Sequence, residues 1–470
     1  GAGAVALTRQ RFPALTAAQI VSALLAAASD LGAAGTDAIF GRGLLDVSAA
    51  LAPLGAVSLP AGASEAEEAR AMAALDGADM QLGSAFGDSI AKGLAATPTI
   101  IVDSFGRAFV TEVSGYVSPA NGRPDLEGLL DPSAAGQTFA TQIAALGSLS
   151  LSFTDVPVET SSLAKRFADT PGGEQSLDAP AITFATGIGR DTELAFGFST
   201  APGPELDAVR RAGVNFASAD LLAVPALEMS GTGESLVLRQ RLDRRTSIRL
   251  AAAFGTRTFD DRYGERARSA VAMDLEHRSD GGVVLSAHAA ALSEEGSFLD
   301  TVSSGSFEAA EGAQTGFLGL STSLPLATVG TLHGRSLLAL TEVSEAGPGV
   351  LSDFSRISST AYSLGLLRRG WFRGEDSFGL VLFQPLRVED GSARLSLPVA
   401  YDYTSGLGTY GDQRMPLSPT GREVGVELAY GLRFDSGAAV QANLLQRFEP
   451  GHVAGAGPET TALVQLKLDF

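Results

Sequence analysis

The last ten residues, Thr461–Phe470, constrain the fold of this chain more than any other stretch. Read back from the terminus in steps of two, one set of positions is apolar: Phe470, Leu468, Leu466 and Val464. The positions between them are polar: Asp469, Lys467 and Gln465. Because successive side chains of a β-strand point to opposite faces, this stretch predicts a strand with one apolar and one polar face. A soluble sheet with a buried apolar face would alternate in the same way, so the stretch alone leaves both arrangements open.

The same alternation repeats through residues 136–470, in segments of strand length separated by clusters of Gly, Asp, Ser and Pro. In the clearest internal case, Glu423–Phe434, every second residue from Val424 onward is apolar. Short connections alternate with long ones, as periplasmic turns and outer loops do in outer-membrane barrels. The pattern favours a mainly β fold: a transmembrane, antiparallel, up-and-down β-barrel of about 12 strands, or 14 if Ala181–Thr200 belongs to it. Unpaired backbone groups are costly in hydrocarbon, so the last strand is expected to pair with the first.

The polar faces of these strands supply the candidate functional residues. If the apolar faces contact lipid, the charged residues between them line the lumen. The pore-lining candidates are Arg239, Arg249, Glu276, Glu423, Glu427, Arg433 and Lys467. Each is equally well explained as part of a salt bridge that holds the shape of the barrel. Aromatic residues near strand ends, among them Trp371, Tyr401 and Tyr403, are typical of interfacial girdles.

The composition excludes several other classes of protein. The net charge of −19 argues against nucleic-acid binding, which needs basic patches. The chain has no Cys, which rules out a disulfide framework and cysteine-based metal sites, and no cofactor or metal is expected. Every window of about 20 residues contains polar breaks, so no transmembrane helix is indicated. Gly1–Thr8 lacks the charged region of a signal peptide, and we expect the chain to be a fragment of a longer protein.

The first 55 residues have the pattern of helices rather than strands. Thr16 and Gln19 have the spacing of a capping box at the start of an apolar helical stripe. From Gly1–Arg11 to the GRGLLD turn at Gly41–Asp46, this segment resembles the carboxy-terminal end of a subtilisin-like serine protease (subtilase). The resemblance implies that residues 1–55 are the last helices of an incomplete protease domain. The catalytic Asp, His and Ser of that family would all lie upstream, so the resemblance implies that this chain alone is inactive as a peptidase.

Residues 56–135 are interpreted as a helical connector between these helices and the strands. Four apolar residues spaced by four predict a helix over residues 80–96: Leu82, Phe86, Ile90 and Leu94. Gly83 and Gly87 lie within it, and a Gly costs roughly 1 kcal/mol in a helix interior. Passage through a narrow barrel lumen would explain them, which makes 80–96 a candidate pore helix. An ordinary linker helix packed on the protease tail is equally compatible.

Taken together, the subtilase tail, the connector and the terminal run of amphipathic strands resemble a subtilase-type autotransporter of Gram-negative bacteria. The resemblance implies an outer-membrane translocator and anchor that exports its own N-terminal protease passenger, with Phe470 as the assembly signal. The implied partners are outer-membrane lipid, the barrel assembly machinery and the passenger, and a monomer is expected. Two other functions stay open. The parent protein could act as a surface-displayed or released serine endopeptidase, or the chain could be a soluble β-rich adhesin.

Overall fold

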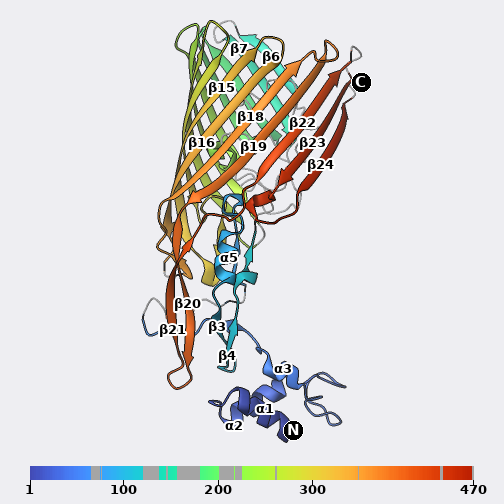
Figure 1. The fold of residues 1–470 in the computed structure, drawn as a ribbon, viewed down its shortest axis with the longest axis vertical. Coiled ribbons are helices and arrows are strands. Elements are labelled where there is room, and N and C mark those ends of the chain that lie inside the picture. Colours follow the sequence, from blue (N-terminus) through green and yellow to red (C-terminus); the bar gives the residue numbers. More distant parts are fainter. Residues whose placement is uncertain are drawn as a thin grey trace.

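In the computed structural model, the described residues are 1–64, 75, 77–119, 137–143, 147–155, 180–200, 216, 225–259, 262–347, 349–434 and 438–467. They form three parts arranged along the long axis of the molecule: a group of N-terminal helices, a stalk and a large curved sheet (Figure 1). The N-terminus lies at the helical end, and the C-terminal strand runs to the opposite end (Figure 1).

Most of the described chain belongs to one antiparallel sheet of 15 strands, whose spatial order follows the sequence. Two shorter strands and one hairpin interrupt the order and lie outside this sheet. The strands of the sheet are β6 (Gln137–Ile143), β7 (Gly147–Asp155), β8 (Pro180–Ile188), β9 (Thr192–Thr200), β10 (Thr232–Arg241), β11 (Thr246–Thr258), β12 (Glu265–Arg278), β13 (Val284–Glu295), β15 (Ala310–Leu326), β16 (Gly330–Glu345), β18 (Ile357–Arg369), β19 (Asp376–Asp390), β22 (Val424–Arg433), β23 (Ala439–Phe448) and β24 (Glu459–Lys467).

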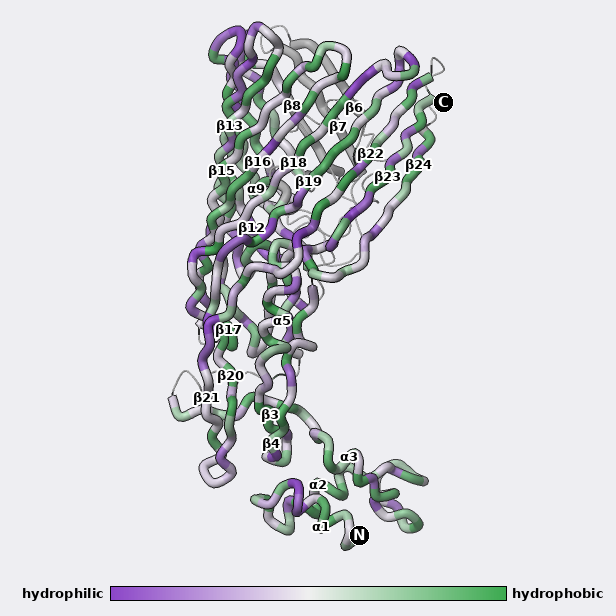
Figure 2. The backbone as a smooth tube through the Cα atoms, viewed as in Figure 1, coloured by the Kyte–Doolittle hydropathy of each residue, from purple (hydrophilic) through white to green (hydrophobic). Residues whose placement is uncertain are grey.

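Hydrophobic and hydrophilic residues follow one another along the strands (Figure 2), and the exposure of the side chains shows that the two faces of the sheet differ as this alternation predicted. Apolar residues on the outer face form rows across neighbouring strands; Leu318 of β15, for example, pairs in register with Leu338 of β16. The adjacent residue Phe317 faces inward and is buried, whereas Leu318 is 60% exposed. The large apolar side chains exposed on this outer face include Leu236, Leu250, Phe254, Val271, Met273, Leu275, Leu285, Leu318, Leu320, Leu338, Leu340, Leu364, Leu380, Leu382, Leu428, Leu444, Val464 and Leu466. An exposed apolar surface of this extent marks an interface with another protein or with a membrane.

The two ends of the sheet are connected differently (Figure 1). At the end that we call the short-turn end, the connections include 189–191, 242–245, 279–283, 327–329 and 370–375. At the opposite, long-loop end, they include 296–309, 346–356, 391–423 and 449–458, although one connection there, 259–264, is also short. The alternation of short and long connections is therefore present, and β24 runs toward the short-turn end (Figure 1).

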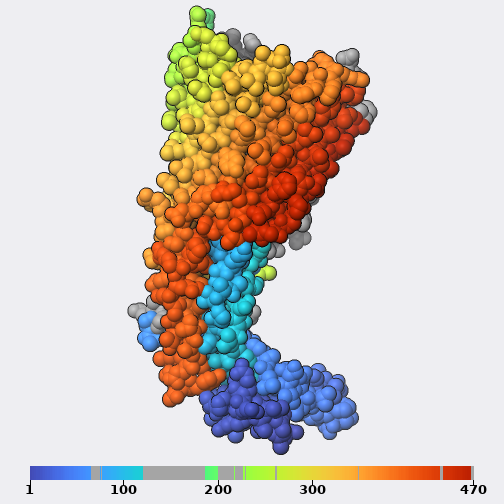
Figure 3. Space-filling view, viewed as in Figure 1, coloured from blue at the N-terminus to red at the C-terminus, as the bar shows by residue number. Residues whose placement is uncertain are grey.

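The stalk extends from the long-loop end toward the N-terminal helices. It contains the hairpin β20 (Ser392–Asp402) and β21 (Leu407–Pro416), which pairs with β17 (Leu351–Ser352). Two further sheets join N-terminal strands to each other and to a long loop: β1 (Val57–Ser58) with β3 (Thr99–Asp103) and β4 (Ala108–Thr111), and β14 (Val302–Ser304) with β2 (Asp79–Gln81) and β5 (Val117–Ser118). Figure 3 shows the hairpin and the N-terminal segments side by side along the stalk.

Three helices form the N-terminal unit: α1 (Ala2–Arg11), α2 (Ala17–Ala26) and α3 (Val47–Leu51). The expected capping box is present, because Gln19 N–H donates to Thr16 Oγ1 at 3.3 Å and Thr16 N–H donates to Gln19 Oε1 at 2.8 Å. A cap of this kind stabilises a helix by about 1 kcal/mol. Phe12 and Ile20 are buried between the helices, so the helical character predicted for this region is confirmed.

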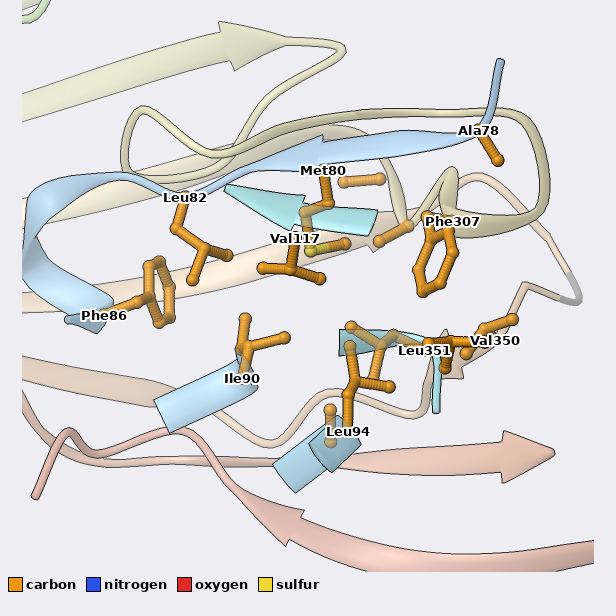
Figure 4. Close-up of a cluster of buried hydrophobic side chains, with 14 of the residues drawn as sticks. Ala78, Met80, Leu82, Phe86, Ile90, Leu94, Val117, Phe307, Val350 and Leu351 are labelled. Carbon is orange, nitrogen blue, oxygen red and sulfur yellow. The ribbon is translucent and has the colours of Figure 1, made fainter. Parts of the chain in front are cut away.

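A hydrophobic core joins the stalk to the long loops of the sheet (Figure 4). Met80, Phe86 and Ile90 come from the N-terminal segment, and Phe307 and Leu351 come from the loops, and each side chain is fully buried. Burying side chains of this size stabilises the contact by about 1.5–3 kcal/mol each. The core therefore fixes the N-terminal segment at the long-loop end.

The predicted pore helix over residues 80–96 is wrong. The stretch contains β2, the 3-10 turn η1 (Ser84–Phe86) and a short helix, α5 (Ser89–Ala95), all in the stalk. Gly83 is extended (φ −66°, ψ 149°), and only glycine fits there because a Cβ would clash with the carbonyl oxygen of Leu299. Gly87 has a φ of +48°, a conformation that favours glycine. The four-residue spacing of the apolar residues reflects packing in the stalk core, not one continuous helix.

The predicted closed barrel of about 12 strands is also wrong. The sheet has 15 strands, and among the described residues its first and last strands, β6 and β24, pair only with β7 and β23. Antiparallel neighbours alternate in direction, so an odd number of strands leaves β6 and β24 pointing the same way, and no antiparallel ladder can join them. The observed architecture is an open, curved, mainly β sheet.

The stalk hairpin shows why alternation alone does not count the strands of the sheet. The segment around Tyr401 alternates like a wall strand, but it belongs to β20 and lies beyond the sheet. Any half-buried hairpin shows that alternation, so period alone cannot distinguish the two. Tyr401 and Tyr403 pack on each other, with ring centroids 4.9 Å apart, and therefore do not join a girdle. Trp371, at the short-turn end, lies under the guanidinium of Arg368, 4.7 Å from the ring centroid.

Candidate functional site

The inner face of the sheet carries charged residues that strand pairing brings together. Arg249 of β11 pairs in register with Arg239 of β10 and with Asp274 of β12. Its Nη2 lies 3.7 Å from Asp274 Oδ2 and 3.7 Å from Glu276 Oε2. Arg239 pairs instead with Glu193, with 3.4 Å between Nη1 and Oε2. The structure thus brings Arg239, Arg249 and Glu276 to one face, where they form ion pairs across neighbouring strands.

The other pore-lining candidates are spread over the length of the sheet. Glu427 is buried on the inner face and accepts a hydrogen bond from Asn443 Nδ2 at 2.7 Å. Arg433 is exposed at the short-turn end. The side chain of Lys467 and the whole of Phe470 lie outside the described residues. Their roles in the pore and in assembly therefore stay predictions.

Glu423 lies at the long-loop end and holds two connections together. Arg447 donates to both of its carboxylate oxygens, at 2.7 and 2.9 Å, and the Gly451 N–H donates to one of them at 2.6 Å. The backbone N–H of Glu423 donates to His452 Nδ1 at 2.9 Å. Burial lowers the pKa of His452 to about 4, so the imidazole is neutral at pH 7 and accepts this bond.

A short helix fills the inner face near the long-loop end, which the sequence analysis did not anticipate. α9 (Pro225–Glu228) and the residues after it bury Ala226, Leu227 and Met229 against that face. The inner-face residues in the same cluster include Ala251, Ala253, Ala270, Leu292, Phe317, Leu337 and Ala339. The small side chains of β11 and β12 make room for the helix. Alanines stand at inward positions of β11 and β12 where a water-filled lumen would have polar residues. This substitution of small apolar residues for polar ones could have predicted a segment packed on the inner face.

A buried arginine fastens this helix to the wall. Arg268 of β12 donates to the carbonyl oxygen of Met229 at 2.7 Å, and its guanidinium lies 3.1 Å from Glu294 Oε1. It also contacts the carboxylate of Asp300 in the following loop. Because Arg268 and Glu294 are almost fully buried, removal of one partner would leave an uncompensated charge, which typically costs about 3–5 kcal/mol. The inner face at this end is therefore packed rather than open.

The stalk is attached to the sheet through Asp88, just before α5. Its carboxylate accepts hydrogen bonds from the Thr420 N–H at 2.8 Å, the Thr420 hydroxyl at 2.7 Å and the Ala454 N–H at 3.1 Å. Lys92 Nζ lies 2.6 Å from the same carboxylate. Burial alone would raise the pKa of Asp88, but the hydrogen bonds from Lys92 and Thr420 outweigh it and bring the pKa to about 2. One ionised carboxylate thus joins the N-terminal segment to two long connections of the sheet.

The N-terminal helices are attached to the stalk through Arg107, in the turn between β3 and β4. Its side chain is fully buried and lies 2.6 Å from Asp103 Oδ2. It also donates to the carbonyl oxygens of Ala50 and Ala52, at the end of α3. The guanidinium lies 5.1 Å from the ring centroid of Phe12, a distance at which cation–π attraction contributes. Residues on both sides of the junction therefore share one arginine.

The N-terminal unit leaves much of its own apolar surface uncovered. Leu7 and Val21, on α1 and α2, are 51% and 47% exposed, and Ile39 is 83% exposed. Phe40, Leu44 and Leu25 are also among its exposed large apolar residues. A stable domain of this size would not expose so many large side chains unless another surface covered them.

None of the helices described here is long and apolar enough to cross a membrane. In the described part of the chain there is also no group of His, Cys, Asp and Glu that could hold a metal ion.

No family model matches the chain, and no curated protein sequence matches it. Among solved structures, it is similar to OprB of Pseudomonas putida, at 11% identity and a TM-score of 0.31 over 68% of this chain and 86% of that one. It is also similar to the outer membrane protein opdK from Pseudomonas aeruginosa, at 11% identity and a TM-score of 0.33 over 70% of this chain and 90% of that one. A third structure, OccK10 (OpdN) of Pseudomonas aeruginosa, matches at 9% identity and a TM-score of 0.33 over 71% of this chain and 92% of that one. TM-scores this low describe only a loose likeness, so the function has to be inferred from the residues of this chain.

Proposed function

We propose that the curved sheet lies in the outer membrane of a Gram-negative bacterium and anchors the N-terminal unit on the outside of the cell. The supporting feature is the apolar outer face, which a soluble β-rich adhesin would have to bury. Leu318, Leu338 and their neighbours in register are exposed across many strands. In lipid these side chains are favourable, while the inward ion pairs such as Arg249–Asp274 stay away from hydrocarbon. In lipid the outer edges of β6 and β24 would each need a hydrogen-bonding partner, because unpaired backbone groups are costly in hydrocarbon.

The loop asymmetry gives the orientation of the sheet. In outer-membrane proteins the short turns face the periplasm and the long loops face outward. The long-loop end carries the stalk and the N-terminal helices (Figure 1). In this orientation the N-terminal unit lies outside the cell, and the end of β24 faces the periplasm.

The anchor role is supported by the way in which the N-terminal segment is built into the long loops. Asp88 is bonded to Thr420 and Ala454, and β2 pairs with β14 of a long loop. These contacts hold the stalk at the long-loop end of the sheet, and Arg107 joins the N-terminal helices to the stalk. We infer that the described state is an anchor after export, because α9 fills the inner face at the long-loop end. Translocation of the passenger would precede this state.

The exported passenger is proposed to be a subtilisin-like serine protease upstream of Gly1. The uncovered apolar side chains of α1 and α2, such as Leu7 and Val21, support this, because a protease domain packed against them would cover them. The parent protein would then act as a surface-displayed or released endopeptidase, while this chain provides the anchor. Outer-membrane lipid, the barrel assembly machinery and the passenger are the proposed partners.

Epitope accessibility in intact Gram-negative cells tests the proposal. One tag is placed before Gly1 and a second replaces the short turn at Asp280–Gly282. The N-terminal tag should be labelled in intact cells, whereas the turn tag should be labelled only after the outer membrane is permeabilised. Both variants should fractionate with the outer membrane. Labelling of the turn tag in intact cells, or recovery of the chain in the soluble fraction, would contradict the proposal.

A further inference from the structure

A carboxylate, an imidazole and a hydroxyl meet on the inner face of the sheet, on three neighbouring strands. Asp274 lies on β12, His288 on β13 and Ser321 on β15. Asp274 pairs in register with His288. Phe317 of β15 is buried on the inner face, and Ser321, four residues later, points to the same face because side chains alternate along a strand. Strand pairing therefore collects the three side chains into one group.

The imidazole of His288 lies between the other two groups. Its Nε2 is 2.9 Å from Ser321 Oγ, and its Nδ1 is 3.5 Å from Asp274 Oδ1. A carboxylate beside Nδ1 favours the tautomer that carries its proton on Nδ1, so Nε2 is left to accept a hydrogen bond from the Ser321 hydroxyl. A nucleophile, a base and a carboxylate that orients the base stand in this order wherever a serine is activated for acyl transfer.

The surroundings hold the carboxylate in place and leave the hydroxyl within reach of the lumen. Asp274 is buried, and its Oδ2 lies 3.7 Å from Nη2 of Arg249. Ser321 is only half-buried, and it lies between the apolar cluster around α9 and the short-turn end. Arg335 of β16 pairs in register with Ser321, which puts their Cβ atoms about 4.5–5.5 Å apart on one face. A cation there can stabilise negative charge that develops on a substrate oxygen.

We propose that Ser321, His288 and Asp274 form a catalytic site that hydrolyses small carboxylic esters. Ser321 Oγ attacks the ester carbonyl carbon while its proton passes to His288 Nε2. The bond from that carbon to the alcohol oxygen then breaks, and Nε2 gives the proton to the departing alcohol. Water attacks the acyl-serine in the same way, with its proton passing to Nε2. The carboxylic acid leaves, and Ser321 Oγ takes the proton back.

The position of the serine within a strand favours esters over peptides. Backbone N–H groups often stabilise the oxyanion of acyl transfer, but β15 is paired with β13 on one side and with β16 on the other. The N–H groups around Ser321 are therefore engaged in the two ladders, and side chains such as Arg335 have to stabilise the oxyanion. An ester needs less stabilisation than an amide, because an alcohol leaves more readily than an amine. Ala272 and Ala290, paired in register on the same face, leave room for a short acyl group.

Hydrolysis of p-nitrophenyl butyrate by the full chain, refolded in detergent micelles, tests the site. The wild-type chain should release p-nitrophenol faster than micelles alone. Ser321→Ala and His288→Gln should each lower the rate by about 10²–10⁴-fold or to that of micelles alone. Asp274→Asn should lower kcat with little change in KM, because Asp274 orients the imidazole and does not touch the ester. The site lies on the inner face, so this test does not depend on contact of the outer face with lipid.

A matched control lies two residues away on the same strand and the same face. Ser323 Oγ contacts His333 Nδ1 at 2.7 Å, and Ser323→Ala should leave the rate unchanged. Hydrolysis that persists at the wild-type rate in Ser321→Ala, or an equal loss of rate in Ser323→Ala, would overturn the assignment. Far-ultraviolet circular dichroism checks that each variant is folded.

Covalent labelling gives a second measurement that needs only the wild-type chain. A fluorophosphonate forms a phosphorus–oxygen bond to an activated serine as fluoride leaves and the hydroxyl proton passes to the base. Peptide mass spectrometry should find the adduct on Ser321 and none on Ser323. Absence of an adduct on Ser321 in the folded wild-type chain, or equal labelling of the two serines, would overturn the assignment.

Discussion

The most informative substitution is Leu318→Arg, in the middle of β15. Leu318 is 60% exposed on the outer face and pairs with Ala289 and Leu338. At an exposed position of a soluble protein this change would cost within about 0.5 kcal/mol. If the position faces hydrocarbon near the midplane, it should cost about 2–4 kcal/mol. A water-exposed and a lipid-facing outer surface therefore predict different costs in the free energy of unfolding for this one substitution.

Gln314→Arg provides the matched control on the same strand and the same face. Gln314 is exposed, donates to Ser293 Oγ at 2.7 Å and pairs in register with Glu342. Four residues separate it from Leu318, which is about 13 Å along a strand. Gln314 and its polar neighbours Ser293 and Glu342 would lie at the membrane boundary, where an arginine costs about 0–1 kcal/mol. The free energies of unfolding of the wild type and both variants are measured by urea titration after folding into liposomes. Equal costs for the two substitutions, or a cost within about 0.5 kcal/mol for Leu318→Arg, would refute a lipid-facing outer surface.

Four further predictions concern the junctions. Arg107→Ala should lower the free energy of unfolding by about 3–5 kcal/mol, because it leaves the buried carboxylate of Asp103 unpaired. Limited proteolysis should then release the N-terminal helices. Protection from proteolysis equal to that of the wild type would contradict the role of Arg107. The pKa of Asp88 is lowered to about 2, so its contribution to stability is full above pH 3.8 and is lost as the pH falls toward 2; Asp88→Asn should flatten the stability profile in that window. The pKa of His452 is lowered to about 4, so the folded state should lose stability, on the order of 3 kcal/mol, as the pH falls from about 6.5 to 4. His452→Gln should remove this loss. A variant whose stability falls with pH as the wild type's does would contradict this role of His452. Gly83→Ala should destabilise the stalk core by about 1–3 kcal/mol, because its Cβ would meet the Leu299 carbonyl at 1.8 Å, and a wild-type thermal transition would contradict this.

Local features were predictable because they depend on neighbouring residues. The capping box of Thr16 and Gln19 needs only a spacing of three, and the exposure of Val464 and Leu466 follows from a period of two. The sorting of short and long connections could also be read from the chain. Each of these features depends on residues close together in the sequence, and each is present in the folded structure.

Features that depend on distant contacts were not predictable. Gly83 lies against the carbonyl of Leu299, far away in the sequence. The spacing of the apolar residues does not show this contact, so it predicted one helix where the stalk has several short elements. Strand β20 was counted as part of the wall because a stalk hairpin alternates in the same way. Closure was inferred from the cost of free edges in hydrocarbon, but the parity of the strand number, which determines the direction of β24 relative to β6, could not be counted from the sequence.

In the candidate site, sequence identified the inward charges but not their partners. Arg249 and Glu276 were both expected on the polar face, and register places them 3.7 Å apart. Glu423 was expected in the lumen, yet it lies at the long-loop end, paired with Arg447. The packing of α9 on the inner face arises from a connection that period-based analysis treats as a loop. Register and loop folding, which are tertiary properties, decide these placements.

The contact of the outer face with lipid is tested most directly by depth-dependent quenching. The chain has no Cys, so single cysteines can be introduced at Leu318, Leu338 and the inward Ala290 and labelled with a fluorophore in vesicles that contain brominated lipids. The account predicts strong quenching at residues 318 and 338 and little at residue 290. Equal quenching at all three positions, or none at the two outward ones, would contradict it.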